Sequence, residues 1–143
     1  MNLENPFIHL PCNQAAENNK KPIFEALSSL GLLASNVLEI GSGTGQQGIY
    51  FCQHSDSLSW QLTEQPNNME MLQAWFDVAK QQNITNLSSP ISFEVGQDSL
   101  VGNQNPKIAN CSYDFIYSAN VLHIVSPELA KTLVTDCSNY LKS

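Results

Sequence analysis

Positive charge is scarce in this sequence. Its 143 residues include six Lys and Arg against 13 Asp and Glu, which gives a formal net charge of −7 at pH 7. A surface that binds nucleic acid needs a stripe of basic side chains to displace counterions from the phosphates, and the sequence has none. We therefore expect no nucleic-acid partner. Charged residues of both signs reach only 13%, and 15 Asn and 11 Gln supply much of the polar surface instead.

Long apolar runs and metal-ligand spacings are also missing. No stretch reaches the 18 apolar residues of a membrane span, and the N-terminal MNLENPFIHL has neither the basic start nor the apolar run of a secretory signal. No C-x-x-C pair and no neighbouring His or Asp cluster suggests a metal site around the four cysteines, which are Cys12, Cys52, Cys111 and Cys137. These absences predict a soluble, cytoplasmic protein with reduced thiols and without a membrane or metal partner.

The apolar residues that are present switch between strand and helix periodicity. Strands are expected at 37–40, 58–62, 91–95 and 113–124, the last with its exit included. Helices are expected from Pro22 to Gly31, around 49–52, over 72–79 and over 126–142, where Ser126 is the N-cap and Pro127 follows it. Strands that alternate with helices predict an α/β fold with a doubly wound parallel sheet. The length predicts a single domain.

A glycine-rich loop follows the first predicted strand, in the run VLEIGSGTGQQGIYF from 37 to 51. A dinucleotide fingerprint would need glycine where the chain has Gln46, and a phosphate-binding loop would need lysine where it has Ile49. Glu39 inside the strand would repel a diphosphate but would suit an amino group. Elimination therefore favours a ligand with an amino group and no phosphate, and S-adenosylmethionine is such a ligand.

The segment EIGSGTG, from Glu39 to Gly45, resembles motif I of the class I S-adenosylmethionine-dependent methyltransferases. The other strand ends agree with this resemblance. Glu64 closes the second strand, where the fold places an acid that accepts bonds from the ribose hydroxyls. Glu94 closes the third strand, near the adenine amine in that family. The run YDFIYSANVLH, residues 113–123, resembles the fourth strand and its exit in small-molecule methyltransferases.

A closer resemblance covers nearly the whole chain. The runs AAENNKKPI, LEIGSGTGQ, WQLTE and SANVLHI resemble an uncharacterised methyltransferase-like family of bacteria and animals, in which they read roughly AAxRNxxPI, LEIxSGTGQH, WxPSD and CANMIHI. Three positions differ: Asn18 replaces Arg, Gln47 replaces His and Glu64 replaces Asp. Glutamate preserves a ribose acceptor, whereas the loss of Arg and His bears on the acceptor pocket or on catalysis.

The resemblance implies S-adenosylmethionine as cofactor and S-adenosylhomocysteine as its product. The implied cofactor-binding residues are Glu39, Gly41, Ser42, Gly43, Gly45, Glu64, Gln65, Glu94, Val95 and Asn120. His123 is the one candidate general base, although a lone histidine in an apolar run is also typical of a packed side chain. Because the sulfonium of S-adenosylmethionine is already activated, alignment of the acceptor supplies most of the rate. Methyl transfer can therefore proceed without a catalytic side chain.

The nature of the acceptor and the activity itself are separate questions. SANVLH lacks the Asn-Pro-Pro-aromatic run expected for methylation of nucleic-acid bases or glutamine, which favours a small-molecule acceptor and leaves a protein acceptor open. One alternative is a non-catalytic module or truncated pseudo-enzyme that holds S-adenosylmethionine or S-adenosylhomocysteine. A second alternative is a nucleotide-dependent oxidoreductase, which Gln46 and Glu39 disfavour.

Two structural expectations concern the ends of the chain. The N-terminal part, about 1–33, is expected to form a helical lid on a Rossmann-like core of about 35–143, with the amide-rich 11–21 folding over the site. The class I sheet has the strand order 3-2-1-4-5-7-6, and no counterpart of the last three strands is expected here. The fourth strand would then be an uncovered edge, which predicts either a fragment or a homodimer joined at that strand.

Overall fold

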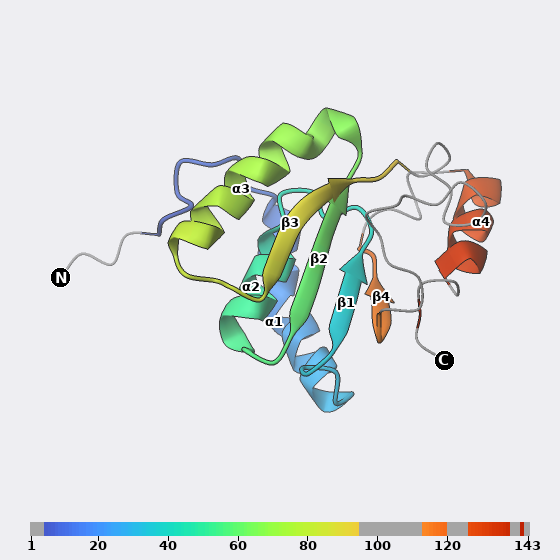
Figure 1. The fold of residues 1–143 in the computed structure, drawn as a ribbon, viewed down its shortest axis with the longest axis horizontal. Coiled ribbons are helices and arrows are strands. Elements are labelled where there is room, and N and C mark those ends of the chain that lie inside the picture. Colours follow the sequence, from blue (N-terminus) through green and yellow to red (C-terminus); the bar gives the residue numbers. More distant parts are fainter. Residues whose placement is uncertain (1–4, 95–112, 120–125, 138–140, 142–143) are drawn as a thin grey trace.

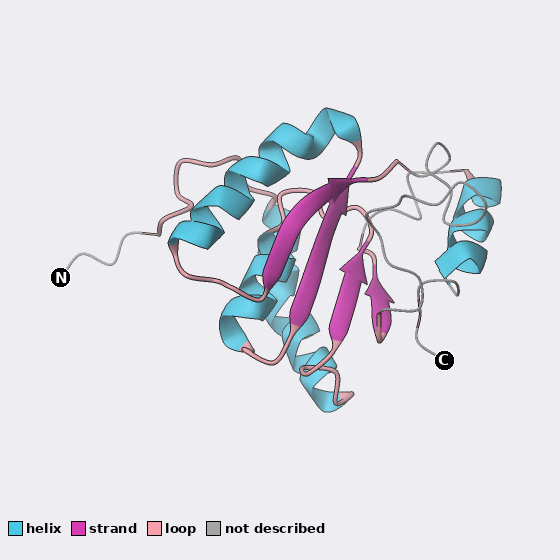
Figure 2. Cartoon of the chain, viewed as in Figure 1, coloured by secondary structure: helices cyan, strands magenta, loops and turns pink. Residues whose placement is uncertain are grey.

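The computed structural model describes residues 5–94, 113–119, 126–137 and 141. These residues form one sheet of four parallel strands in the order β3-β2-β1-β4, flanked by helices (Figures 1 and 2). The strands are β1 (Asn36–Glu39), β2 (Ser59–Glu64), β3 (Leu87–Ser92) and β4 (Phe115–Tyr117). The helices are α1 (Gln14–Ser29), α2 (Gln46–His54), the 3₁₀ turn η1 (Pro66–Asn68), α3 (Met69–Gln81) and α4 (Pro127–Cys137). The predicted fold class, a doubly wound parallel α/β sheet, is confirmed.

Each face of the sheet has its own apolar core, because successive side chains of a strand point to opposite faces. Val37, Trp60 and Leu62 pack with α1, α2 and α3 on one face, and Figure 1 shows α1 and α2 behind the strands. Leu38 and its neighbours on the other face pack against Leu133 of α4. The alternation along β1 therefore decides that Glu39 shares the face of Val37.

The predicted start of the N-terminal helix was wrong. The sequence predicts a helix that begins at Pro22, but α1 begins at Gln14 and contains Pro22 in its interior. Asn13 caps the helix, because its side chain accepts a hydrogen bond of 3.0 Å from the Ala16 N–H. An interior proline removes one helical hydrogen bond, and the packing of the apolar face of α1, which includes the buried Leu27, outweighs that loss.

The predicted end of the last helix was also wrong. The pattern extends a helix through Leu141, but Leu141 forms a parallel bridge with Tyr113, just before β4. β4 is the last strand in the sheet order, as predicted. Because Leu141 pairs with Tyr113, a later part of the same chain lies beside the start of β4.

The third strand begins earlier than predicted. Alternation of apolar residues over 91–95 places it too late, since β3 begins at Leu87 and ends at Ser92. Pro90 within the strand obscures the pattern, and an edge strand tolerates a proline because one side has no ladder to donate to. Glu94 therefore lies two residues beyond the strand rather than at its end.

Candidate functional site

A cavity of about 270 Å³ lies at the carboxyl ends of β1 and β2, beside the glycine-rich loop. It brings together most of the predicted cofactor-binding residues, namely Glu39, Gly41, Ser42, Gly43, Glu64, Gln65 and Glu94. Open parallel sheets bind ligands at this edge, next to the point where the strand order reverses. The predicted Val95, Asn120 and His123 lie outside the described residues.

The glycine loop takes a backbone conformation that suits glycine. Gly41, Gly43 and Gly45 have φ angles of 73°, 61° and 83°, in the left-handed region. Gly45 does not line the cavity but precedes α2 as its N-cap, where a Cβ would lie 2.8 Å from Cδ1 of Leu72. The loop therefore turns sharply from β1 into α2 and leaves its backbone open to the cavity.

Backbone and hydroxyl hydrogen bonds fix the loop to the end of β2. The Ser42 N–H donates to the Thr63 carbonyl at 2.7 Å, and the Thr63 N–H donates to the Ser42 hydroxyl at 3.0 Å. The Thr63 hydroxyl donates to the Glu39 carbonyl at 2.6 Å. These bonds join the glycine loop to both β1 and β2.

The Glu64 carboxylate is held by two backbone amides. Its Oε2 accepts from the Gly43 N–H at 2.7 Å, and its Oε1 accepts from the Gln65 N–H at 2.8 Å. A carboxylate oxygen has two acceptor sites, so each oxygen can still accept a bond from a ligand hydroxyl. Glu64 lines the cavity in a fixed orientation, which suits recognition of a diol.

The Glu39 carboxyl is almost fully buried, with 2% of the residue exposed. Its Oε1 accepts a hydrogen bond of 3.0 Å from the Trp60 indole N–H, and its carboxyl also bonds to Ser42. Burial raises the pKa of Glu39 to about 7, against the two hydrogen bonds, and the nearby negative charge of Glu64 adds to the rise. Within the part of the chain that the structure describes, no cation pairs with this carboxyl, which makes its ionised form a strong acceptor for a ligand ammonium group.

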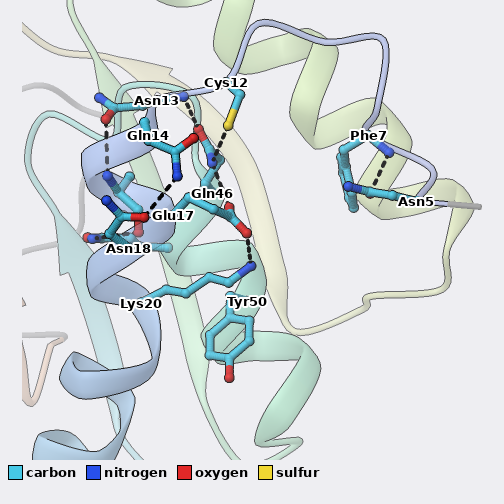
Figure 3. Close-up of polar contacts among 12 residues, drawn as sticks. Asn5, Phe7, Cys12, Asn13, Gln14, Glu17, Asn18, Lys20, Gln46 and Tyr50 are labelled. Carbon is cyan, nitrogen blue, oxygen red and sulfur yellow. Dashed lines mark hydrogen bonds and ion pairs between the residues drawn. The ribbon is translucent and has the colours of Figure 1, made fainter.

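Gln46 connects the N-terminal segment to the glycine loop (Figure 3). Its Oε1 accepts from the Asn13 N–H at 2.6 Å and from the Thr44 hydroxyl at 2.7 Å. Its Nε2 donates to Glu17 Oε2 at 2.9 Å and contacts Cys12 Sγ at 3.5 Å. From the sequence, Gln46 served only to exclude a dinucleotide fingerprint. Its role in joining the N-terminal segment to the glycine loop was not predicted.

Gln47 makes a second connection from α2. Its Oε1 accepts from the Tyr117 hydroxyl of β4 at 2.6 Å, and its Nε2 donates to the Ala16 carbonyl of α1 at 3.4 Å. Gln47 lines the cavity, whereas Asn18 is exposed and accepts a bond from Gln14. Of the three departures from the resembling family, Gln47 and Glu64 line the cavity and Asn18 does not.

The N-terminal arm, residues 5–13, packs along α3 before it reaches the cavity. The rings of Phe7 and Trp75 stack with centroids 4.8 Å apart, and the Trp75 indole N–H donates to the Pro11 carbonyl at 2.8 Å. Asn13 and Ala16 then contribute to the cavity wall. The expectation that residues 11–21 fold over the site as a lid stays a prediction.

The part of the chain that the structure describes also bears on metal binding and membrane insertion. No group of three or more His, Cys, Asp or Glu side chains that could hold a metal ion occurs there. In the same part of the chain, no helix has the length and hydropathy that crossing a membrane requires.

Solved structures share this fold. A provisionally assigned S-adenosylmethionine-dependent methyltransferase from Methanococcus maripaludis matches with a TM-score of 0.63 and 18% identity, over 100% of this chain and 63% of its own. A provisionally assigned sarcosine dimethylglycine methyltransferase from Galdieria sulphuraria matches with a TM-score of 0.67 and 19% identity. The match covers 90% of this chain and 43% of that protein. Coclaurine N-methyltransferase, bound to N-methylheliamine and S-adenosylhomocysteine, matches with a TM-score of 0.58 and 13% identity. The match covers 87% of this chain and 33% of that protein.

The chain therefore has the Rossmann-like fold of S-adenosylmethionine-dependent methyltransferases, and it spans less than two thirds of each of these proteins. It belongs to the family described as "Protein of unknown function (DUF938)", whose profile matches residues 10–143. The predicted resemblance to methyltransferases is confirmed at the level of the fold.

Proposed function

We propose that the chain binds S-adenosylmethionine at the glycine-loop cavity and transfers its methyl group to a small-molecule acceptor. The observation that carries this proposal is the pair of buried acids at the cavity. Glu39 offers an acceptor for an amino group, and Glu64 is oriented for a diol by the Gly43 and Gln65 amides. A ligand with both groups and no phosphate matches this pair.

In the proposed complex the methionine part of the cofactor lies at Glu39 and Gly41, and the ribose lies at Glu64. The adenine lies near Glu94, with Gln65 beside it. Ser42, Gly43 and Gly45 shape the loop beneath the ligand, and Val95 and Asn120 complete the proposed set. The loop and Glu64 are already joined by hydrogen bonds, so binding needs little rearrangement of the described residues.

The chemistry asks the protein for alignment more than for proton transfer. An acceptor held in line with the methyl group gains most of the rate from proximity. The small-molecule class is supported by the negative net charge and by the solved complex of coclaurine N-methyltransferase with N-methylheliamine, which has the same fold. His123 stays the one candidate base, for an acceptor that must lose a proton.

The second candidate is a non-catalytic module that binds the cofactor or its product. Gln47 favours it, because both ends of its amide are already engaged, by Tyr117 and Ala16, at a position where the resembling family has a histidine. A single-turnover experiment separates the two candidates. It measures loss of the methyl group from bound S-adenosylmethionine in the presence of a panel of small amines and hydroxyl compounds. Methyl loss only with an acceptor supports the enzyme, and tight binding without loss supports the module.

Three further proposals concern organisation. We propose one domain over 1–143, with the lid at about 1–33 and the core at about 35–143, located in the cytoplasm. We also propose a homodimer through the β4 edge, where an apolar cavity is lined by Ile116, Leu133 and Val134. Val134 is 61% exposed, which supports an interface on this side.

The experiment that tests the cofactor assignment is a calorimetric titration of the protein with S-adenosylmethionine, S-adenosylhomocysteine and NAD. We expect one site for the first two ligands and no heat of binding for NAD, because Glu39 repels a diphosphate. Binding of NAD alone would instead support an oxidoreductase.

A further inference from the structure

Trp60 lies directly beneath the acid that the cofactor proposal uses. It is fully buried in β2 and pairs with Val37 of β1, two residues before Glu39. Side chains two residues apart along a strand share a face, so the indole and the Glu39 carboxyl meet on the α2 side of the sheet. The indole N–H donates to Oε1 of Glu39 at 3.0 Å.

Gly48 of α2 makes room for this contact. A Cβ at that position would lie 2.6 Å from Nε1 and 2.9 Å from Cδ1 of Trp60. The helix therefore passes over the polar edge of the indole at a distance that only a glycine permits. Gly48 is helical and its backbone needs no unusual φ, so the close approach to Trp60 is the reason for glycine here.

Aromatic neighbours hold the indole in this orientation. Its ring centroid lies 5.4 Å from that of Phe51 and 5.4 Å from that of Tyr117, and 6.4 Å from that of Phe115. These rings come from α2 and β4, so they enclose the indole from two elements. A side chain packed in this way cannot turn its N–H away from Glu39 without moving its neighbours.

The indole N–H of Trp60 is important for the ionised form of Glu39 because of the other groups that surround this carboxyl. Among the described residues, the titratable neighbours of Glu39 are Glu64 at the end of β2, Cys52 of α2 and Tyr117 of β4, none of which carries a positive charge. The ion pair found within the described residues joins Lys20 to Glu17 and does not involve Glu39. The Trp60 N–H and Ser42 are the hydrogen-bonding groups that offset burial of the charge.

We propose that Trp60 is a positioning residue of the cofactor site, whose indole N–H, admitted by Gly48, favours the ionised form of the Glu39 carboxyl and aims it at the amino group of the ligand. This inference rests on the proposed function for the identity of the ligand. It assigns to a buried tryptophan an electrostatic role besides its packing. It also predicts that the pH dependence of ligand binding depends on Trp60.

The test uses Trp60→Phe, which keeps an aromatic ring but removes the donor, with Gly48→Ala as a second variant that displaces the indole. Trp75→Phe is the matched control, because it removes an indole N–H that bonds to Pro11 instead. The titration midpoint of the Glu39 carboxyl is measured by carbon-13 NMR in the ligand-free protein. S-adenosylhomocysteine affinity is measured by calorimetry at pH 6 and pH 9.

Both variants should raise the Glu39 midpoint by about one pH unit, the effect of losing one charge-assisted hydrogen bond. Affinity should fall about tenfold at pH 6 and recover to within about threefold of the unmutated protein at pH 9. Comparing each variant with the unmutated protein at the same pH cancels titration of the ligand's own amino group. Trp75→Phe should leave the Glu39 midpoint unchanged.

The two readouts separate the possible failures. An unchanged Glu39 midpoint in both variants overturns the role of Trp60, whether or not the ligand binds. An affinity loss equal at both pH values overturns it too, since that is the signature of a packing defect. A shifted midpoint in a protein that binds no S-adenosylhomocysteine at either pH overturns the proposed function, and with it the ligand part of this inference.

Discussion

Glu39→Gln should make the ligand-free protein more stable at alkaline pH while it weakens cofactor binding. The Glu39 carboxyl is buried among apolar and aromatic groups, and its pKa is raised to about 7 by that burial. Glutamine has the same shape, accepts the same hydrogen bond from Trp60 and never carries a charge. The substitution therefore removes the cost of burying an anion and keeps the packing.

The magnitude follows from the difference in pKa between the folded and unfolded chains. Between pH 4.5 and pH 7 the unfolded chain has released the Glu39 proton while the folded chain retains it, so stability falls as pH rises through this window. A shift from 4.5 to about 7 corresponds to about 3 kcal/mol when the group is fully ionised in both states. Glu39→Gln should recover about 2 to 3 kcal/mol more at pH 8 than at pH 5.

Urea denaturation of both proteins at pH 5 and pH 8, without ligand, measures this difference. Other carboxylates titrate alike in the two proteins, so they largely cancel when the free energies of unfolding are compared at each pH. A change in stability that is the same at pH 5 and pH 8 would refute the reasoning, because it would show that the folded state does not hold Glu39 with a raised pKa.

Three further predictions test the loop, the arm and the assembly. Gly45→Ala should destabilise the fold by about 1 to 3 kcal/mol more than Gly31→Ala in urea denaturation, since both have positive φ but only the first Cβ meets Leu72; equal losses would rule out the steric term. Gln46→Met should speed amide exchange of Asn13 by at least about tenfold, and S-adenosylhomocysteine should slow that exchange in the unmutated protein; no change in either comparison would contradict the lid. Light scattering at micromolar concentration should give twice the 15.8 kDa mass, and a stable monomer would contradict the β4 dimer.

The fold could be predicted because the periodicity of buried strands and helices is a local property. β1 and α3 match the pattern closely, since their apolar positions repeat within a few residues. The start of α1 could not be predicted in the same way, because Pro22 inside a helix opposes the local rule and tertiary packing decides. Leu141 was assigned to a helix for a similar reason, as its pairing with Tyr113 spans distant parts of the chain.

The candidate site was predictable where a motif carries it, and less so where distant residues meet. The glycine loop, Glu39 and Glu64 gather at the cavity as the resemblance implies. Gln46 and Gln47 act through partners 33 and 70 positions away, and no local pattern marks such contacts. Trp60 lies within the strand predicted at 58–62, but its bond to Glu39 depends on the register of two strands.

The most direct test of the central claim is a calorimetric titration of Glu64→Ala with S-adenosylhomocysteine. Glu25→Ala, which removes an exposed carboxylate of α1 away from the cavity, is the matched control. Loss of a carboxylate that accepts bonds from two ribose hydroxyls should cost about 2 to 3 kcal/mol of binding free energy, about 30-fold to 150-fold in affinity. The account predicts that loss for Glu64→Ala and unchanged affinity for Glu25→Ala, whereas equal affinity in both variants, or no binding by the unmutated protein, would contradict it.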